Sequence, residues 1–86
     1  MKKIYILTIV SLAADGCLSF DTLKYDTYEK AKSYGDERLD DWVADCDIDE
    51  NGELIGVNVT RGTYFVEALS TCSIAEFDYS ISVFEV

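Results

Sequence analysis

Residues 3 to 11, with the sequence KIYILTIVS, constrain the fold more than any other stretch of the chain. They are rich in β-branched and aromatic residues, and apolar side chains fall on both faces of the strand that they predict. A strand of this kind is typical of the interior of a covered sheet. Ala14-Asp15-Gly16 predicts a turn in which Gly16 takes a positive φ. Residues 17 to 25 alternate as a second strand, paired antiparallel with the first.

The helix predicted after this hairpin is marked by its first turn and by one apolar stripe. Asp26 is the expected N-cap, and Glu29 follows three residues later as in a capping box. The stripe recurs at steps of three and four along roughly five turns, and consists of Tyr28, Ala31, Gly35, Leu39, Trp42 and Cys46. Gly35 lowers helix stability by up to about 1 kcal/mol relative to alanine. A close approach of the helix to the sheet would explain it, and Trp42 is expected to anchor the helix there.

Strand and turn signals fill the rest of the chain. Asn51-Gly52 predicts a tight turn. Strands are expected at residues 54 to 60, 63 to 69 and 76 to 86, with a turn at 61 to 62 and a connection at 70 to 74. The predicted fold is therefore a single α+β domain of order ββαβββ, an antiparallel sheet of about five strands with one helix packed on one face. A single helix leaves the other sheet face uncovered, so we expect that face to meet a second copy of the chain or another partner.

Composition limits the function classes open to the chain. About half of its 86 residues are apolar, as in folded globular proteins. A net charge of -10 argues against direct binding to nucleic acid or to an anionic membrane, and favours a basic protein surface or metal cations as partners. The N-terminal residues resemble a secretory signal, but the apolar run is too short to span a bilayer and we interpret it as a buried strand. We therefore expect a cytoplasmic protein.

Catalytic and cofactor signals are missing from the sequence. There is no histidine, so neither the commonest general base nor a Ser-His or Cys-His pair is available. The three cysteines, Cys17, Cys46 and Cys72, include no CxxC pair and predict reduced thiols rather than a zinc site. No glycine-rich phosphate loop is present. We expect a protein that is not an enzyme and that uses no cofactor.

The strongest functional signal is the acidic stretch from Asp36 to Glu53, in which nine acids face one base, Arg38. The predicted outer face of the helix carries Lys32, Asp36, Glu37, Asp40, Asp41 and Ala44. Like charges four residues apart destabilise a helix, and acids near its C-terminus oppose the macrodipole. One explanation is that this face meets a basic site on another protein; the alternative is a solvated acidic surface. The candidate partner-binding residues are Asp36, Glu37, Asp40, Asp41, Asp45, Asp47 and Asp49.

Residues 47 to 54 resemble the opening of an EF-hand loop. Asp47, Asp49 and Asn51 occupy ligand positions 1, 3 and 5, Gly52 follows at position 6, and Glu53 is a further oxygen donor. Position 12, where a bidentate glutamate belongs, is Asn58, and a strand is predicted where the exiting helix should begin. A calcium site at Asp47, Asp49, Asn51 and Glu53 is therefore the alternative hypothesis, beside an acidic turn without metal. A third hypothesis is a structural subunit that assembles through the uncovered sheet face.

A chain of this size that opens MKKIYILTI, starts its helix with YDTYEKAK and has an acidic middle resembles small proteins of phages and mobile elements. That group includes anti-CRISPR proteins and other anti-defence inhibitors, several of which are acidic mimics of nucleic acid. The resemblance implies a non-enzymatic inhibitor that occupies the basic groove of a nucleic-acid-handling protein. It transfers no functional residues to individual positions of this chain.

Overall fold

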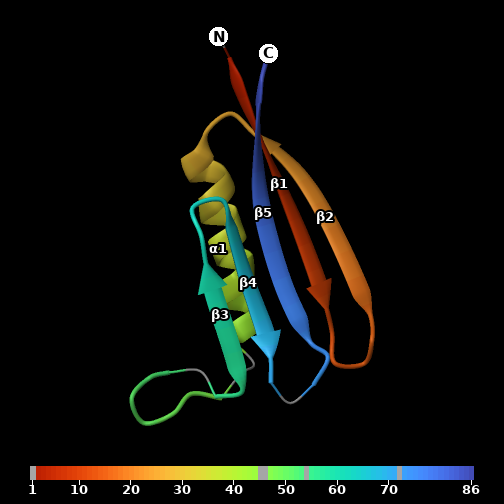
Figure 1. Ribbon diagram of the computed structural model, residues 1–86, viewed down its shortest axis with the longest axis vertical. Coiled ribbons are helices and arrows are strands. Elements are labelled where there is room, and N and C mark those ends of the chain that lie inside the picture. The colour runs from red at the N-terminus through yellow and green to blue at the C-terminus, as the bar shows by residue number, and fades with distance from the viewer. Residues whose placement is uncertain (1, 45–46, 54, 72) are drawn as a thin grey trace.

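The computed structural model describes residues 2–44, 47–53, 55–71 and 73–86. Within these residues, an antiparallel sheet and one helix form two layers (Figure 1). The elements are β1 (Lys3–Leu12), β2 (Leu18–Tyr25), α1 (Tyr28–Val43), β3 (Val57–Arg61), β4 (Phe65–Ser70) and β5 (Glu76–Glu85). This order, ββαβββ, confirms the predicted α+β fold.

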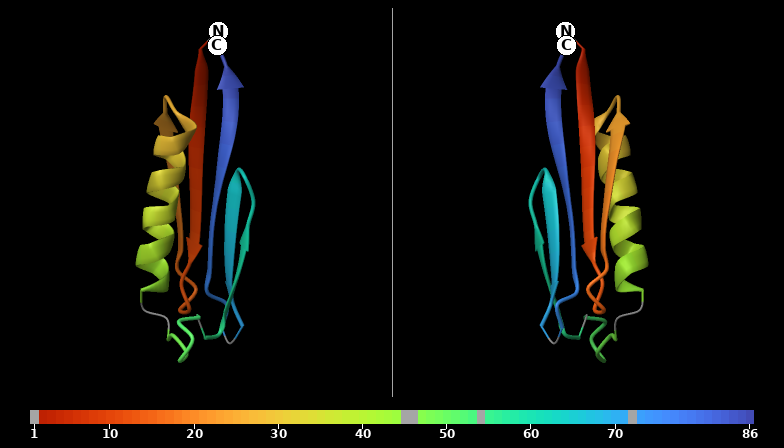
Figure 2. Two further views of the ribbon diagram at one scale, coloured as in Figure 1. Left: turned by 90° about the vertical axis from the view of Figure 1, so that its left-hand side faces the viewer. Right: turned by 90° about the vertical axis from the view of Figure 1, so that its right-hand side faces the viewer.

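The five strands lie in the order β2-β1-β5-β4-β3, and every neighbouring pair is antiparallel. β1 is an interior strand, as its apolar side chains predict. β1 and β5 pair over their whole length, from Lys3 opposite Glu85 to Leu12 opposite Glu76. The two ends of the chain therefore lie side by side (Figures 1 and 2), and the Lys2 and Val86 backbones exchange hydrogen bonds of 3.2 and 2.9 Å.

The turn between β1 and β2 forms where the sequence predicts it. Gly16 has a φ of 94°, a conformation that favours glycine. The amide of Ala13 donates to the Cys17 carbonyl over 2.8 Å, and the Asp15 carboxylate accepts the Cys17 amide over 2.9 Å. The register set by this turn places Leu23 and Tyr25 toward the helix. Lys24, which lies between them, points toward the other face of the sheet.

α1 packs against one face of the sheet and leaves the other face open (Figure 2). The core lies between the two layers and consists of Leu7, Ile9, Ala31, Leu39, Val66, Ala68, Phe77, Tyr79 and Ile81. A Cβ added to Gly35 would lie 3.0 Å from the Tyr79 ring, which confirms the predicted close approach of the helix. Trp42 packs on Phe77, with ring centroids 6.1 Å apart, and so anchors the helix to the sheet.

The helix begins differently from the prediction. Its N-cap is Thr27, which has an extended backbone and whose Oγ1 accepts the Lys30 amide over 3.2 Å. Asp26 lies one residue too early for this role. Its carboxylate instead pairs with Lys30 Nζ at 3.1 Å, and the hydrogen bond from Lys30 lowers the pKa of Asp26. The helix ends at Val43. Cys46, the predicted last position of the apolar stripe, lies outside the described residues.

The second half of the chain follows the predicted order with shifted boundaries. Asn51-Gly52 is a turn, as expected: Gly52 has a φ of 81° and its amide donates to the Asp49 carbonyl over 3.0 Å. β3 begins at Val57, after Gly56, whose φ of 76° interrupts the extended backbone. Residue 54, the predicted start of this strand, lies outside the described residues. The following turn continues to residue 64, and the amide of Gly62 closes it by donating to the Phe65 carbonyl over 2.9 Å.

Among the described residues, α1 is neither long enough nor apolar enough to cross a membrane, and no other helix is present to do so.

Candidate functional site

The acidic helix surface is defined here as Glu37, Asp40, Asp41 and Asp47. The first three project from α1 and the fourth from the loop that follows it, and all four are exposed. None of them forms an ion pair with any residue that the structure describes. Asp45, which the sequence placed among these residues, lies outside the described part of the chain. The unpaired acids therefore cover the outside of the helix toward its C-terminal end.

Arg38 is the single base within residues 36 to 53, and it does not neutralise this surface. Its Nη1 donates to Asp21 Oδ2 over 2.9 Å and to the Tyr34 hydroxyl over 3.3 Å. These bonds turn the guanidinium toward β2, and they raise the pKa of Arg38. No basic residue occupies the last turn of α1 either. The like charges of the acidic helix surface are therefore uncompensated on their own side of the helix.

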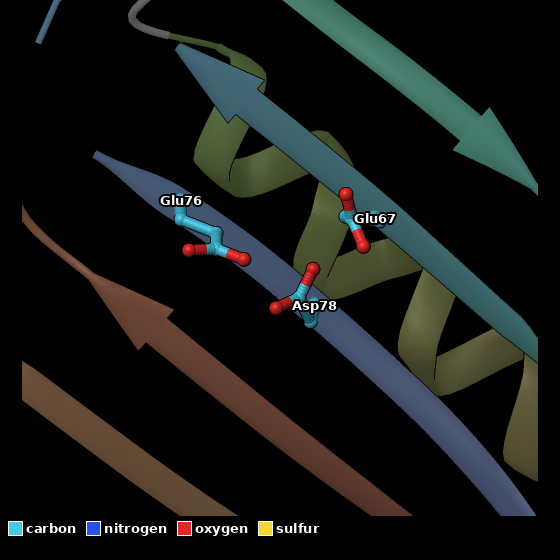
Figure 3. Close-up of side chains that lie close together, drawn as sticks. All are labelled: Glu67, Glu76 and Asp78. Atoms are coloured by element: carbon cyan, nitrogen blue, oxygen red, sulfur yellow. The ribbon is translucent and has the colours of Figure 1, made fainter. Parts of the chain in front are cut away.

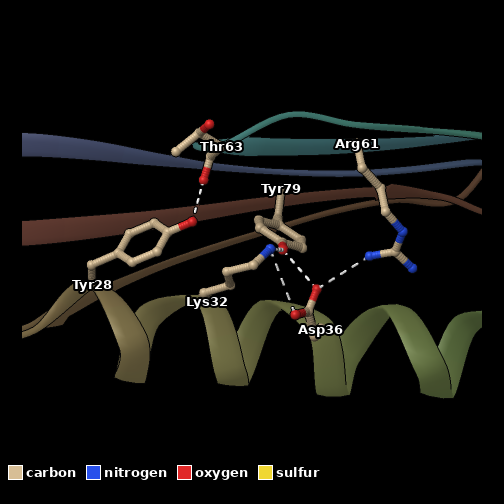
Figure 4. A network of polar contacts seen from close by, with 6 residues as sticks. All are labelled: Tyr28, Lys32, Asp36, Arg61, Thr63 and Tyr79. Atoms are coloured by element: carbon tan, nitrogen blue, oxygen red, sulfur yellow. Dashed lines mark hydrogen bonds and ion pairs between the residues drawn. The ribbon is translucent and has the colours of Figure 1, made fainter.

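Asp36 was predicted on the outer face of the helix, and this is wrong: its carboxylate points toward the sheet and contacts Tyr79. Its Oδ1 accepts a 2.7 Å hydrogen bond from the Tyr79 hydroxyl and lies 3.7 Å from Arg61 Nη1, and its Oδ2 lies 3.7 Å from Lys32 Nζ (Figure 4). Lys32, also predicted to face outward, donates to the Tyr79 hydroxyl over 3.2 Å.

The physical reason for this network is Gly35. Without a side chain there, the helix approaches the Tyr79 ring, and residues 32 and 36 lie on either side of the Tyr79 hydroxyl. Burial and the bond to Asp36 raise the pKa of Tyr79, which therefore stays a donor. Tyr28 adds a second link between helix and sheet, because its hydroxyl donates to the Thr63 carbonyl. The network ties α1 to β5 and to the β3–β4 turn.

The described residues of the 47 to 53 loop do not form a preassembled calcium site. Asp49 Oδ1 accepts the amides of Asn51 and Glu53, each over 2.9 Å, and so holds the turn together. The loop carboxylates of Asp47, Asp49 and Glu53 do not gather within 4.8 Å of one another, whereas another group of three acids does. Asp49, which was also expected to bind a partner, is half-buried and engaged in the turn.

That other group, Glu67, Glu76 and Asp78, is the acidic cluster of the sheet. Its carboxylate oxygens lie within 4.8 Å of one another, on the sheet face opposite α1 (Figure 3). Burial, followed by the nearby Glu76 and Glu67 carboxylates, raises the pKa of Asp78 to about 7. Asp78 Oδ1 is buried and has no hydrogen-bond partner among the described residues.

Sequence reasoning missed this cluster because it depends on strand register. Glu67 pairs with Asp78 across β4 and β5, and Glu76 lies two residues before Asp78 on the same face. The alternation of the predicted strand at 76 to 86 puts Glu76 and Asp78 on the face opposite Phe77, Tyr79 and Ile81, but it says nothing of Glu67. Only the observed pairing of the two strands brings them together.

The acidic cluster lies within an apolar surface. The open face is defined here as the sheet face opposite α1. Large apolar side chains are exposed on three of its strands, β2, β4 and β5: Leu18, Phe20, Phe65, Leu69 and Phe84, exposed by 38 to 65%. Lys24 projects from the same face, since its neighbours Leu23 and Tyr25 pack against the core. Contiguous exposed apolar surface is a feature of protein interaction sites.

Basic side chains gather at the end of the molecule where the chain termini lie. Lys2, Lys3, Lys24 and Lys30 line a cavity of about 390 Å³ there. The loop of residues 47 to 53 lies at the other end (Figure 1). The lysine-lined cavity and the acidic loop therefore lie at opposite ends of the longest axis of the molecule, which measures 47 Å.

No family model, curated protein or solved structure matches this chain. Its function is therefore argued from the acidic helix surface, the acidic cluster and the open face.

Proposed function

We propose that the chain is a small, non-enzymatic, cytoplasmic binding protein whose acidic helix surface occupies a basic groove on a nucleic-acid-handling protein. The carboxylates of this surface take the places that phosphates would occupy in the groove. The sequence resemblance to anti-CRISPR and other anti-defence inhibitors points to a host defence nuclease as the target. The observation that carries the proposal is that Glu37, Asp40, Asp41 and Asp47 are exposed and lack ion pairs among the described residues.

The arrangement of these acids has an energetic cost that a basic partner would remove. Glu37 and Asp41 are four residues apart on one helix, which places like charges about one turn, or roughly 6 Å, apart along the axis. They also lie in the C-terminal half of α1, where the macrodipole disfavours negative charge. Phosphates in a nucleic acid form a similar line of closely spaced charges. A groove that binds such a line offers lysine and arginine side chains at comparable spacing.

Two of the acids expected to make these contacts are engaged within the chain. Asp36 and Asp49 were expected among them, but the first is bonded to Tyr79 and the second holds the loop turn. Glu37, Asp40, Asp41 and Asp47 remain as the proposed contact residues. Arg38 is paired with Asp21 and would not repel a basic partner.

The experiment that tests this function compares capture of proteins from a bacterial lysate by immobilised variants. The test variant is Asp40→Lys/Asp41→Lys on the acidic helix surface. The matched control is Asp15→Lys/Glu85→Lys, which changes the net charge equally at two exposed positions outside α1. We expect the wild-type protein and the control to capture a nucleic-acid-binding protein that high salt releases, because salt screens exposed charges over about 10 Å at 0.1 M.

The test variant should capture none of this protein, and addition of duplex DNA should compete with the wild-type protein for it. Equal capture by both double variants, or capture unaffected by salt, would contradict the proposal.

A further inference from the structure

The open face carries both signs of charge, and their positions are fixed by the strand register. Lys24 of β2 lies opposite Ile6 of β1, which lies opposite Ser82 of β5. The acidic cluster is on β5 and β4, at Asp78, Glu76 and Glu67. The base therefore lies toward one corner of the face and the acids toward the other end, with the apolar side chains of β1 between them.

From this arrangement we propose that the open face binds a second copy of the same chain, with Lys24 of each copy placed over the acidic cluster of the other. A two-fold axis in the plane of the interface makes both contacts at once, because every contact in an isologous interface occurs twice. The strands of the two sheets then cross at a large angle, which is one of the two observed modes of sheet-on-sheet packing.

The acidic cluster has no positively charged partner among the residues that the structure describes. The oxygens of three carboxylates lie within 4.8 Å of one another, and none of the ion pairs among the described residues involves any of them. Asp78 Oδ1 is buried without a hydrogen-bond partner among those residues. A hollow of about 170 Å³ lies beside Asp78 and Glu67, bounded by Thr8, Val10 and Phe65. A lysine side chain from above can enter this hollow and place its ammonium near all three acids.

Lys24 is suited to supply that charge. Four other bases, Lys30, Lys32, Arg38 and Arg61, are already paired with acids of their own chain. Lys24 is exposed, and it projects from the face that also holds the acids. A foreign partner that carried only basic residues would meet Lys24 with like charge. A second copy of the chain would place its acidic cluster over Lys24 of the first copy, and its own Lys24 over the acidic cluster of the first copy.

The apolar surface supplies the contact area. The molecule measures 47 × 29 × 16 Å, so each broad face is larger than the roughly 800 Å² that one partner buries in a standard interface. Phe20, Phe65 and Phe84 are exposed by 65, 45 and 54%. Aromatic side chains are enriched at the centres of such interfaces. The shortest extent, 16 Å, corresponds to two layers, one helix and one sheet. In a face-to-face dimer the two sheets would lie in the middle, with one helix on each outer side.

The dimer leaves the proposed function accessible. α1 lies on the other side of the sheet, so the acidic helix surfaces of the two copies face outward in opposite directions. The two proposals can therefore fail separately. A monomer that still captures a nucleic-acid-binding protein would refute only the dimer, and a dimer that captures none would refute only the inhibitor function.

The experiment measures the mass of the full chain by sedimentation over a wide concentration range. We expect a monomer–dimer equilibrium. Lys24→Glu should weaken it by about tenfold or more, because a carboxylate then faces three others across a partly desolvated interface. The matched control is Lys3→Glu, which makes the same charge change beside the core face of β1 and should leave the dimer intact.

Mixing two variants separates a specific contact from a general charge effect. Glu67→Lys should also weaken the dimer when alone, since Lys24 then meets a lysine. An equimolar mixture of Lys24→Glu with Glu67→Lys should form a mixed dimer, because each new charge faces its opposite. A wild-type monomer at every concentration, equal effects of Lys24→Glu and Lys3→Glu, or a mixture that stays monomeric would each overturn the proposal.

Discussion

The hydroxyl of Tyr79 donates a 2.7 Å hydrogen bond to Asp36 Oδ1, and this contact joins the middle of α1 to the central strand of the sheet. Tyr79 is 2% exposed, so its polar end depends on partners supplied by the helix. Lys32 and Arg61 add positive charge around the same carboxylate. An acid that the sequence places on the outer face is therefore part of the helix–sheet contact.

Asp36→Ala should lower the free energy of unfolding by about 1–2 kcal/mol. It removes the acceptor of the Tyr79 hydroxyl and leaves a largely buried donor with fewer partners. Glu37→Ala is the matched control, since Glu37 is the next residue and is exposed; its effect should stay within about 0.5 kcal/mol. Urea unfolding of both variants measures the difference. Equal stability of the two would contradict the structural role of Asp36.

Gly35→Ala should destabilise the protein by about 1–3 kcal/mol, although alanine has the higher helix propensity. The added methyl group would lie 3.0 Å from three atoms of the Tyr79 ring, which is held between helix and sheet. Ser33→Ala makes a small substitution on the exposed side of the same helix, and should be neutral or slightly stabilising. Thermal unfolding of both variants checks this, and a gain in melting temperature for Gly35→Ala would show that the helix can move away.

The sequence predicted the parts of the structure that depend on local periodicity. The β-branched and apolar residues 3 to 11 and the alternation in residues 76 to 86 identified two long strands, and the stripe through Gly35 identified the helix face that packs on them. Alternation puts Phe77, Tyr79, Ile81 and Val83 on one face of the last strand; the first three are buried, and Val83 near the strand's end is 40% exposed. These features are encoded within single segments, so one sequence is enough to identify them.

Contacts between segments that are far apart in the sequence could not be predicted. The acidic cluster requires Glu67 to lie opposite Asp78, and the position of Asp36 requires a particular rotation of the helix over Tyr79. Strand order and helix rotation arise from the packing of the whole core, which the spacing of residues along the chain does not specify. The acidic helix surface was predicted from composition, but composition did not distinguish Asp36 from Glu37.

Thr27→Ala should cost about 1 kcal/mol of stability, because the Thr27 hydroxyl caps the helix by accepting the Lys30 amide. Asp26→Ala is the comparison that separates the observed cap from the one expected from the sequence. Its ion pair with Lys30 is exposed, and exposed pairs contribute little to stability. Chemical denaturation should therefore rank Thr27→Ala as the less stable variant. The reverse order would assign the cap to Asp26.

Asp78→Asn should change how stability depends on pH. The pKa of Asp78 is raised to about 7 in the folded chain by burial and by the neighbouring carboxylates, whereas an unfolded aspartate titrates near 4. The folded state therefore binds the proton more tightly, and the Asp78 contribution to stability is lost as pH rises from about 4 to about 7. Asparagine carries no charge, so the variant should lack this loss and be more stable than the wild-type protein above pH 7, by up to about 4 kcal/mol for a shift of about three pKa units.

The measurement is urea unfolding at a series of pH values, at a protein concentration low enough to keep the chain monomeric. Glu85→Gln is the control, because it makes the same kind of change at an exposed position in β5. Its stability should follow that of the wild-type protein across the series. Parallel pH profiles for Asp78→Asn and the wild-type protein would show that Asp78 is ionised in the folded chain throughout this range, and that the three carboxylates do not interact as the geometry indicates.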